Sequence, residues 1–446
     1  MRAASHDHGV ELTAPVAAAT RQREVGALLR RLLGLGSLAG IVAGTLVIVS
    51  SFASQRSVLV PERYGGLPDW LRGPLRNTGY QLLPSGFARV LLAMTALYLV
   101  ALLCAPAVRT RWIVAAIVTA HAILLLGPAL ISADVFGYLD WARMGALHGL
   151  NPYSHDSGTV VSDAVYRFVR WHTLTSPYGP FFTLISYAIV PIGLAGSFWA
   201  LKLIAVGSSL GCVALIGQIA REGKLPARAA ILLYGLNPAL LIYVIGGFHN
   251  DVLMMLGVMG GVYLMVRRRE AAGAVVAATA VAIKVSAGLV IPFLLLGARE
   301  RGRAVTFALA TGAAVLVVGF IAFGGQALDF INVLGSQQRL NSGTSVPAQL
   351  GGLLGWTGSP TPVRIFFSAA GLAGIAFFLI RAFRGADWVT QAGWATLTVL
   401  VTTSWLLPWY IVWLIPLAAV SRGRALRVAA VGMTLFIVLV RVVPLY

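Results

Sequence analysis

A chain of 446 residues that is 58% hydrophobic and only 11% charged does not have the composition of a water-soluble domain, whose charged fraction is normally about a quarter. The formal net charge of +19 could indicate a nucleic-acid partner, but the arginines fall in short clusters between apolar runs rather than in one stripe with aromatic residues. Composition and charge therefore exclude a soluble enzyme, argue against nucleic-acid binding, and predict an all-α polytopic protein whose partner is the lipid bilayer.

The N-terminal part of the chain gives the first topological signal. Residues 1–31 carry several arginines, which places them in the cytoplasm as a tail under the positive-inside rule. The apolar run Leu32–Ser54 is too long for the core of a signal peptide, so we expect an uncleaved membrane anchor. Together with a second apolar run, Gly86–Ala107, it predicts an N-terminal transmembrane helix pair over 32–111.

The longest segment between spans, 133–196, decides the topology of the rest. It follows the run Trp112–Ser132 and contains a further apolar run, Phe181–Leu194. If that run crossed the bilayer, the basic clusters Arg221–Lys224 and Arg267–Arg269 would both face outward, against the positive-inside rule. We therefore expect it to form a juxtamembrane or re-entrant helix within a large outer loop.

Two modules follow from this assignment. The module 112–303 ends in a short helical hairpin over 271–296, whose outer tip carries Lys284. A C-terminal transmembrane module, 304–446, contains a second large outer loop, 326–360. The complete pattern predicts about 13 transmembrane helices.

The segment from Ser132 to Gly149 has the pattern of a helix with a cap at each end. Asp134, Tyr138 and Trp141 share one face at helical spacing, and an apolar stripe predicts that this helix lies along the membrane interface. A carboxylate there can take the proton from a sugar hydroxyl as that hydroxyl attacks an anomeric carbon. The alternative is that Asp134 only caps or solvates the start of the helix.

Two turn-forming segments follow in the same loop, Asn151-Pro152-Tyr153 and Ser176-Pro177-Tyr178-Gly179-Pro180. They would end one juxtamembrane helix and begin the next. Asn151, Tyr153 and Tyr178 are also candidates for lining a sugar site, although an interfacial belt of tyrosines is the more ordinary explanation.

Lys202 and Lys284 lie in or beside predicted spans, where a charge costs about 2.5 to 3.5 kcal/mol on insertion scales. The sequence assigns no opposed carboxylate to either lysine. An anionic phosphodiester leaving group would compensate such a charge. We expect Lys202 to extend to the outer face, and Lys284, at the hairpin tip, to be a candidate for binding phosphate.

Two more outer segments carry polar candidates. The string Gly246-Gly247-Phe248-His249-Asn250-Asp251 opens a span. His249 could donate to a phosphate or an acceptor hydroxyl, while Asp251 is also a good helix N-cap. Arg339 lies in the donor-rich loop 336–345, which fits a saccharide or phosphate contact or an ordinary solvated loop.

The order of these motifs, together with the string Leu407-Pro408-Trp409-Tyr410-Ile-Val-Trp413-Leu-Ile-Pro416-Leu-Ala, resembles that of a known family. The chain resembles the GT-C fold glycosyltransferases. Within them it looks most like the polyprenol-phosphate-mannose-dependent α-1,6-mannosyltransferases that build lipomannan and lipoarabinomannan backbones in actinobacteria. The resemblance runs from about Trp112 to Leu417.

This resemblance implies a GT-C-like catalytic module over 112–303, on the extracytoplasmic side of the plasma membrane. Asp134 would be the general base of an inverting transfer from β-mannosyl-phospho-polyprenol to a growing α-1,6-mannan glycolipid. No cofactor is predicted, and metal dependence is left open. The candidate substrate-binding residues are Tyr138, Trp141, Asn151, Tyr153, Tyr178, His249, Asp251, Lys284, Arg339, Trp409 and Tyr410, with Lys284, His249 and Arg339 on the phosphate side.

One departure from the family keeps alternatives open. In many GT-C enzymes the catalytic carboxylate follows the first membrane helix, whereas Asp134 follows the third predicted span. An extra N-terminal helix pair reconciles the two; otherwise Glu62 or Asp69, in the first outer loop, is the rival base. A transporter or flippase is the alternative from another class, and a non-catalytic subunit that binds a polyprenyl lipid is a third.

Overall fold

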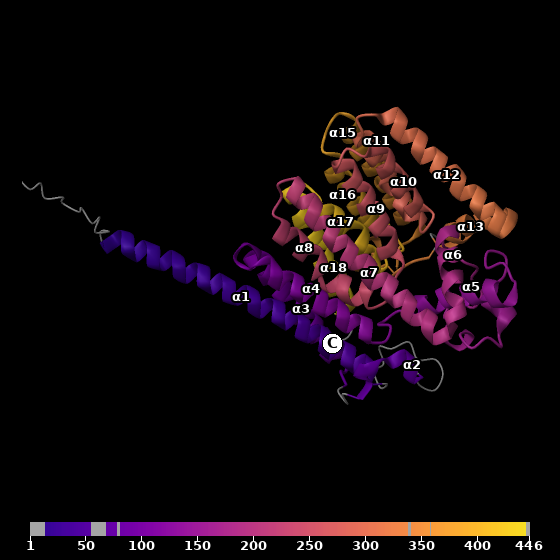
Figure 1. Cartoon of the computed structure of the whole chain (residues 1–446), viewed down its shortest axis with the longest axis horizontal. Helices are drawn as coiled ribbons and strands as arrows, with labels where there is room; N and C mark the ends of the chain where they lie inside the picture. The colour runs from indigo at the N-terminus through magenta and orange to yellow at the C-terminus, as the bar shows by residue number, and fades with distance from the viewer. Residues whose placement is uncertain (1–13, 55–67, 78–80, 338–339, 357, 443–446) are drawn as a thin grey trace, which may run out of the picture.

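The computed structural model describes residues 14–54, 68–77, 81–337, 340–356 and 358–442, and every regular element in them is helical. Figure 1 shows a bundle of helices from which the first part of α1 (Ala14–Ala53) projects. At 40 residues this helix is about 60 Å long, about twice the hydrocarbon thickness of a bilayer. α1 begins at Ala14, within the predicted cytoplasmic tail of residues 1–31, so the sequence analysis missed that the second half of this tail is helical.

The N-terminal helices pack closely because glycines face large side chains. Gly40 of α1 lies against Leu97, and Gly44 lies against Met94; both partners belong to α3 (Pro84–Cys104). α4 (Thr110–Leu126) packs beside α1 as well. The predicted helix pair is thus part of the bundle and covers one side of it.

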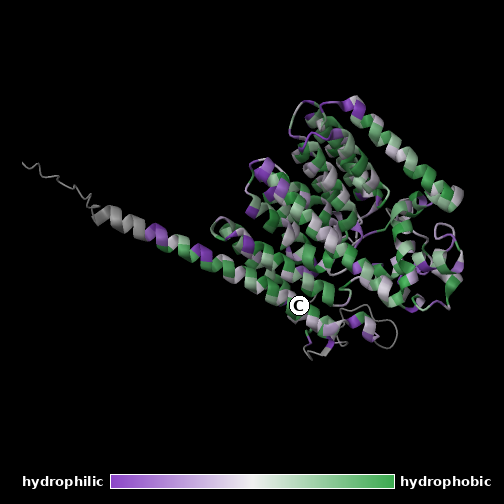
Figure 2. Cartoon of the chain, in the orientation of Figure 1, coloured by the Kyte–Doolittle hydropathy of each residue, from purple (hydrophilic) through white to green (hydrophobic). Residues whose placement is uncertain are grey.

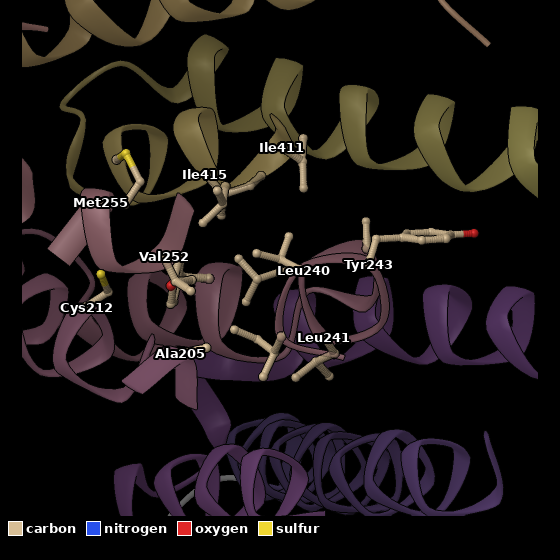
Figure 3. Close-up of a cluster of buried hydrophobic side chains, with 14 of the residues drawn as sticks. Ala205, Cys212, Leu240, Leu241, Tyr243, Val252, Met255, Ile411 and Ile415 are labelled. Atoms are coloured by element: carbon tan, nitrogen blue, oxygen red, sulfur yellow. The ribbon is translucent and has the colours of Figure 1, made fainter. Parts of the chain in front are cut away.

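The core lies around α7 (Gly193–Glu222), α9 (Asp251–Val266) and α17 (Ile411–Val420). Figure 3 shows side chains from these helices meeting those of a π-helical turn, Leu240–Ile245. The meeting side chains include Ala205, Cys212, Leu240, Val252 and Ile411, all of them buried. This packing fixes the helix ends that carry the candidate site.

The outer helices α12 (Arg301–Phe323) and α15 (Thr361–Phe383) bury little of their apolar surface within the protein (Figure 2). Six helices in the described part of the chain are long and apolar enough to cross a membrane, and five shorter apolar helices accompany them. The chain is therefore a polytopic membrane protein. The count of about 13 spans stays a prediction.

The expected outer loops contain short helices. In the first loop, α5 (Asp134–His148) is followed by α6 (Pro180–Ile189), after which the chain turns at Gly193, whose φ is 80°. The ten residues of α6 reach about 15 Å, half of the hydrocarbon thickness, so α6 alone does not span a bilayer.

The remaining helices are α2 (Asp69–Arg72), α8 (Ala227–Gly235), α10 (Glu270–Val281), α11 (Ile291–Gly297), α13 (Phe330–Gln337), α14 (Val346–Leu353), α16 (Trp388–Thr402) and α18 (Arg424–Val442). Turns of 3-10 helix lie at Pro74–Asn77, Ala105–Ala107, Ser157–Val160, Tyr166–Phe168, Val190–Ile192, Val285–Leu289, Gly324–Leu328 and Pro408–Tyr410.

A close backbone contact joins the start of α6 to the hairpin after α10. The amide of Gly179 donates to the carbonyl of Ile283 at 3.2 Å, and the amide of Phe181 donates to the carbonyl of Ala282 at 3.2 Å. A Cβ on Gly179 would overlap the carbonyl oxygen of Ala282. Glycine is therefore required at position 179 for this approach.

We expect Gly179→Ala to lower the free energy of unfolding by about 1 to 3 kcal/mol, because the added methyl group forces two backbone segments apart. Gly288→Ala is the matched control, since a Cβ there meets no atom within 4 Å. Thermal unfolding of both purified variants in one detergent measures the difference. Equal midpoints for the two variants would contradict the close contact.

Candidate active site

The candidate site forms where four chain segments meet: the start of α5, the start of α9, the hairpin after α10 and the start of α17. Oδ2 of Asp134 lies 3.3 Å from Nδ1 of His249. The side chain of Asp134 is 18% exposed, whereas that of His249 is fully buried. The structure thus pairs the predicted carboxylate with the predicted histidine and leaves the carboxylate accessible.

The imidazole of His249 is held between an aromatic ring and the backbone. It stacks on the Trp409 ring with 3.9 Å between centroids and 16° between planes. A Cβ on Gly247 would lie 2.6 Å from Nε2 of the imidazole, so glycine makes room for the ring. Within the described residues, neither ring nitrogen makes a hydrogen bond, so the 3.3 Å contact of Nδ1 with Asp134 is an electrostatic one. The ring is fixed in place by packing, with one nitrogen turned to Asp134.

Unusual backbone precedes both residues of this pair. Ile131 has φ of 60° and Phe248 has φ of 54°, a left-handed conformation that is disfavoured for β-branched and bulky residues. A backbone hydrogen bond joins the two segments: the amide of Leu130 donates to the carbonyl of Gly246 at 2.8 Å. Gly246 directly follows the π-helical turn. Strained backbone and π-helical turns are both frequent at functional sites.

Asp251 is paired instead of capping a helix. Its Oδ2 accepts from Nζ of Lys284 at 2.7 Å, and its Oδ1 accepts from Nε1 of Trp413 at 2.6 Å. α9 begins at Asp251 with no side-chain cap, so the N-cap prediction was wrong. The sequence assigned no opposed carboxylate to Lys284; the structure supplies Asp251, which lies 33 positions away in the sequence.

The environment of Asp134 favours its ionised form. Burial raises the pKa of this carboxyl group, but His249, Lys284 and the Ser132 hydroxyl oppose that effect, and the pKa lies below its ordinary value. Ser132, expected as the N-cap, accepts from the amide of Asp134 at 3.2 Å, and α5 begins one residue later than a cap at Ser132 requires. Gly149 ends the helix in the left-handed conformation, as predicted.

Aromatic side chains form the wall beside Asp134. The Tyr138 and Tyr178 rings meet edge to face at 5.0 Å, and Trp141 contacts Tyr178 at 5.7 Å. The hydroxyl of Tyr138 accepts from the amide of Asn250 at 3.4 Å. Of the apolar stripe on α5, Leu139 and Ala142 are buried in protein, whereas Ala146 is exposed, so the position of this helix along the membrane interface stays a prediction.

Of the remaining candidates, Asn151 and Tyr153 lie outside this cluster. Nδ2 of Asn151 donates to the carbonyl of Phe323 at 2.7 Å, and the Tyr153 hydroxyl donates to the carbonyl of Tyr178 at 2.9 Å. Both side chains hold the outer loop in place, and the structure does not bring them to Asp134. Arg339 lies outside the described residues. Tyr410 belongs to the cluster, because Nζ of Lys284 lies 5.8 Å from its ring centroid.

Lys202 does not extend to the outer face, which corrects the expectation for it. Its side chain is fully buried, and Nζ donates to the carbonyl of Gly127. The same atom lies 3.7 Å from the ring centroid of Trp199 and 4.7 Å from that of Phe248. Aromatic faces therefore surround this ammonium group.

Asp69, a rival base in the first outer loop, is more exposed than Asp134 and is paired with arginines. Asp69 is 67% exposed and forms ion pairs with Arg72 at 3.1 Å and Arg76 at 3.4 Å; Glu62 lies outside the described residues. No group of three or more His, Cys, Asp or Glu side chains in the described segments could hold a metal ion.

Sequence reasoning missed two contributors to the site. Trp413 was quoted in the Leu-Pro-Trp-Tyr string without a role, although it donates to Asp251. Asn250 is 4% exposed, and neither Oδ1 nor Nδ2 has a hydrogen-bond partner among the described residues. Its place between His249 and Asp251 was the only available signal.

The comparisons with known proteins cover the segments that form this cluster. A family model described as "Alpha-(1->6)-mannopyranosyltransferase, N-terminal domain" matches residues 37–300, which include Asp134, His249 and Lys284. This chain belongs to that family. A model described as "MptB C-terminal domain" matches residues 343–444, which include Trp409 and Trp413. The cluster therefore draws on both matched regions.

Curated relatives include proteins of Mycobacterium tuberculosis and Corynebacterium glutamicum. The chain is 27% identical to Alpha-(1->6)-mannopyranosyltransferase A of Mycobacterium tuberculosis, over 71% of this chain and 67% of that protein. It is 30% identical to Alpha-(1->6)-mannopyranosyltransferase A of Corynebacterium glutamicum, over 39% of this chain and 36% of that protein. It is 25% identical to that organism's Alpha-(1->6)-mannopyranosyltransferase B, over 66% of this chain and 56% of that protein. No solved structure matches the chain.

The buried pair makes a prediction about stability. We expect Lys284→Met to lower the free energy of unfolding by about 3 to 5 kcal/mol, because Asp251 keeps a buried charge without its cation. The double variant Asp251→Asn/Lys284→Met should recover most of that loss. Thermal unfolding measures these two proteins and the single variant Asp251→Asn, with Lys224→Met, at an exposed turn, as the control. Additive effects of the two single changes would contradict the pairing.

Proposed function

We propose that this protein is an inverting mannosyltransferase. It moves mannose from a polyprenyl-phosphate-mannose donor to a growing α-1,6-mannan acceptor at the outer face of the membrane. The observation that carries the proposal is the ionised, partly accessible carboxylate of Asp134, held against the buried His249 and lined by aromatic rings. Membership of the family supports mannose as the sugar.

In the proposed reaction Asp134 accepts the proton of the acceptor hydroxyl. The hydroxyl oxygen forms a bond to the anomeric carbon while the bond from that carbon to the phosphate oxygen breaks. The electron pair leaves with the polyprenyl phosphate, and attack from the opposite face turns a β-linked donor into an α-linked product. The partly exposed ring of Trp409 supplies a surface on which a sugar ring packs, and the buried rings of Tyr138 and Tyr178 support the region beside Asp134.

The geometry of α9 supports the outer face. Asp251 begins this helix and belongs to the site, whereas the basic cluster Arg267–Arg269 follows its other end. The 16 residues between these points span about 24 Å. Since arginine clusters favour the cytoplasmic side, the site belongs on the opposite side.

Substituting the proposed base tests the reaction. We expect Asp134→Asn to lower mannose transfer about 10²- to 10⁴-fold, because a proton acceptor is lost while the shape of the side chain is kept. The assay supplies membranes with polyprenyl-phosphate-mannose and a short α-1,6-mannoside. Asp69→Asn, at the rival carboxylate, should retain activity. The reverse result for these two variants would move the base to the first outer loop.

Membrane orientation has its own test. Cys104 and Cys212 are both buried, so an introduced cysteine can be labelled against a low background. In intact cells an impermeant thiol reagent should label Ser154→Cys, in the outer loop, and should leave Arg268→Cys unlabelled until the membrane is opened. Labelling of Arg268→Cys alone in intact cells would invert the topology.

A transporter stays the second candidate because of one observation. The buried Asp251–Lys284 pair is the kind of ionisable pair that coupling sites in transporters use. The assay above separates the two functions, since a flippase moves the donor lipid across vesicles without forming a glycosidic bond. Bond formation that is abolished by Asp134→Asn excludes the transporter.

A further inference from the structure

An apolar groove lies between α11, α12 and α15, away from the candidate active site. Its volume is about 440 Å³, and Leu295, Val305, Leu379 and Phe383 line it, with Arg301 at one end. Arg301 begins α12, whereas the opposite end of α12, at Phe323, contacts the outer loop that carries Asn151. The groove therefore lies at the end of α12 that is remote from the outer loop.

The helices around this groove face lipid. Only 17% of the apolar stretch of α12 and 6% of that of α15 is buried within the protein. Figure 1 shows α12 along the outside of the bundle, and in Figure 2 the ribbon of α12 is coloured mainly as hydrophobic beyond its first turn. An acyl chain from the bilayer can reach the groove without passing a polar barrier.

Positive charge lies at one end of the groove. The guanidinium of Arg301 lies 5.9 Å from the ring centroid of Phe383. Arg384 is one helical turn beyond Ile380, a lining residue, and so lies on the same face of α15. Among the described residues neither arginine forms an ion pair.

The neighbouring acidic groups already have partners. Glu300 pairs with Arg303 at 3.2 Å, and Glu270 accepts from the backbone amides of Arg299 and Glu300. The charge of Arg301 and Arg384 is therefore left for an external anion. The first turn of α12, which no side chain caps, adds the positive end of a helix dipole beside Arg301.

We propose that this groove binds an anionic phospholipid. One acyl chain lies along Val305, Leu379 and Phe383, and the phosphate lies between Arg301 and Arg384. Basic pockets between membrane helices on the cytoplasmic side bind acidic headgroups in this manner. A phospholipid is favoured over the donor lipid because the arginines stand at the opposite end of the bundle from Asp134. The bound lipid would fill the space between α12, which packs on α10, and α15, which packs on α16.

Lipid binding by the purified full-length protein tests this site. Native mass spectrometry in a neutral detergent should show that phosphatidylglycerol is retained in preference to phosphatidylcholine. Arg301→Gln/Arg384→Gln should weaken phosphatidylglycerol binding about thirtyfold, which corresponds to about 1 kcal/mol for each arginine near a charged lipid. Arg422→Gln/Arg424→Gln, at another exposed basic turn, is the charge-matched control and should bind normally.

A second variant tests the chain-binding part without changing charge. Val305→Trp fills the groove and should lower phosphatidylglycerol retention, while Asp134→Asn should leave it unchanged even when mannose transfer is lost. This separation distinguishes the lipid site from the proposed reaction. Equal retention of the neutral lipid, an equal loss in the control, or binding of polyprenyl phosphate but not phosphatidylglycerol would overturn the proposal.

Discussion

The contact between Asp134 and His249 depends on one backbone hydrogen bond. The amide of Leu130 donates to the carbonyl of Gly246 and joins two segments that are more than a hundred positions apart. Each segment then turns through a residue with left-handed backbone, Ile131 in one and Phe248 in the other. Such residues cost about 1 to 3 kcal/mol each and persist only where their surroundings hold them. The tightly packed core under this bond supplies that support.

Asp251 connects the other parts of the site. Its two oxygens accept from a lysine after α10 and from an indole on α17, so one buried side chain fixes the relative positions of three helices. The pair carries no net charge, which limits the cost of burying it. Movement at any of these helix ends would therefore shift the neighbouring side chains of His249 and Asp134.

Much of the architecture could be predicted from local sequence. Apolar run length predicted a polytopic helical protein, helical spacing placed Asp134, Tyr138 and Trp141 on one face, and Gly149 was recognised as a helix end. The errors concern partners that are distant in the sequence. Periodicity showed an apolar face on α5 but not whether protein or lipid covers it, and no spacing rule pairs Lys284 with Asp251 or places Lys202 under aromatic rings. These contacts arise from tertiary packing.

The helices α5, α9 and α17 all begin at the site, at Asp134, Asp251 and Ile411. The amino end of a helix carries a partial positive charge of about half an electron, produced by amide groups that have no partner within the helix. Lys284 is neutralised by Asp251 and Asp134 is ionised, so the positive potential available to an anion in this region comes from the oriented peptide dipoles rather than from a free side-chain cation. Such a field is built into the backbone, and it is present before any ligand arrives.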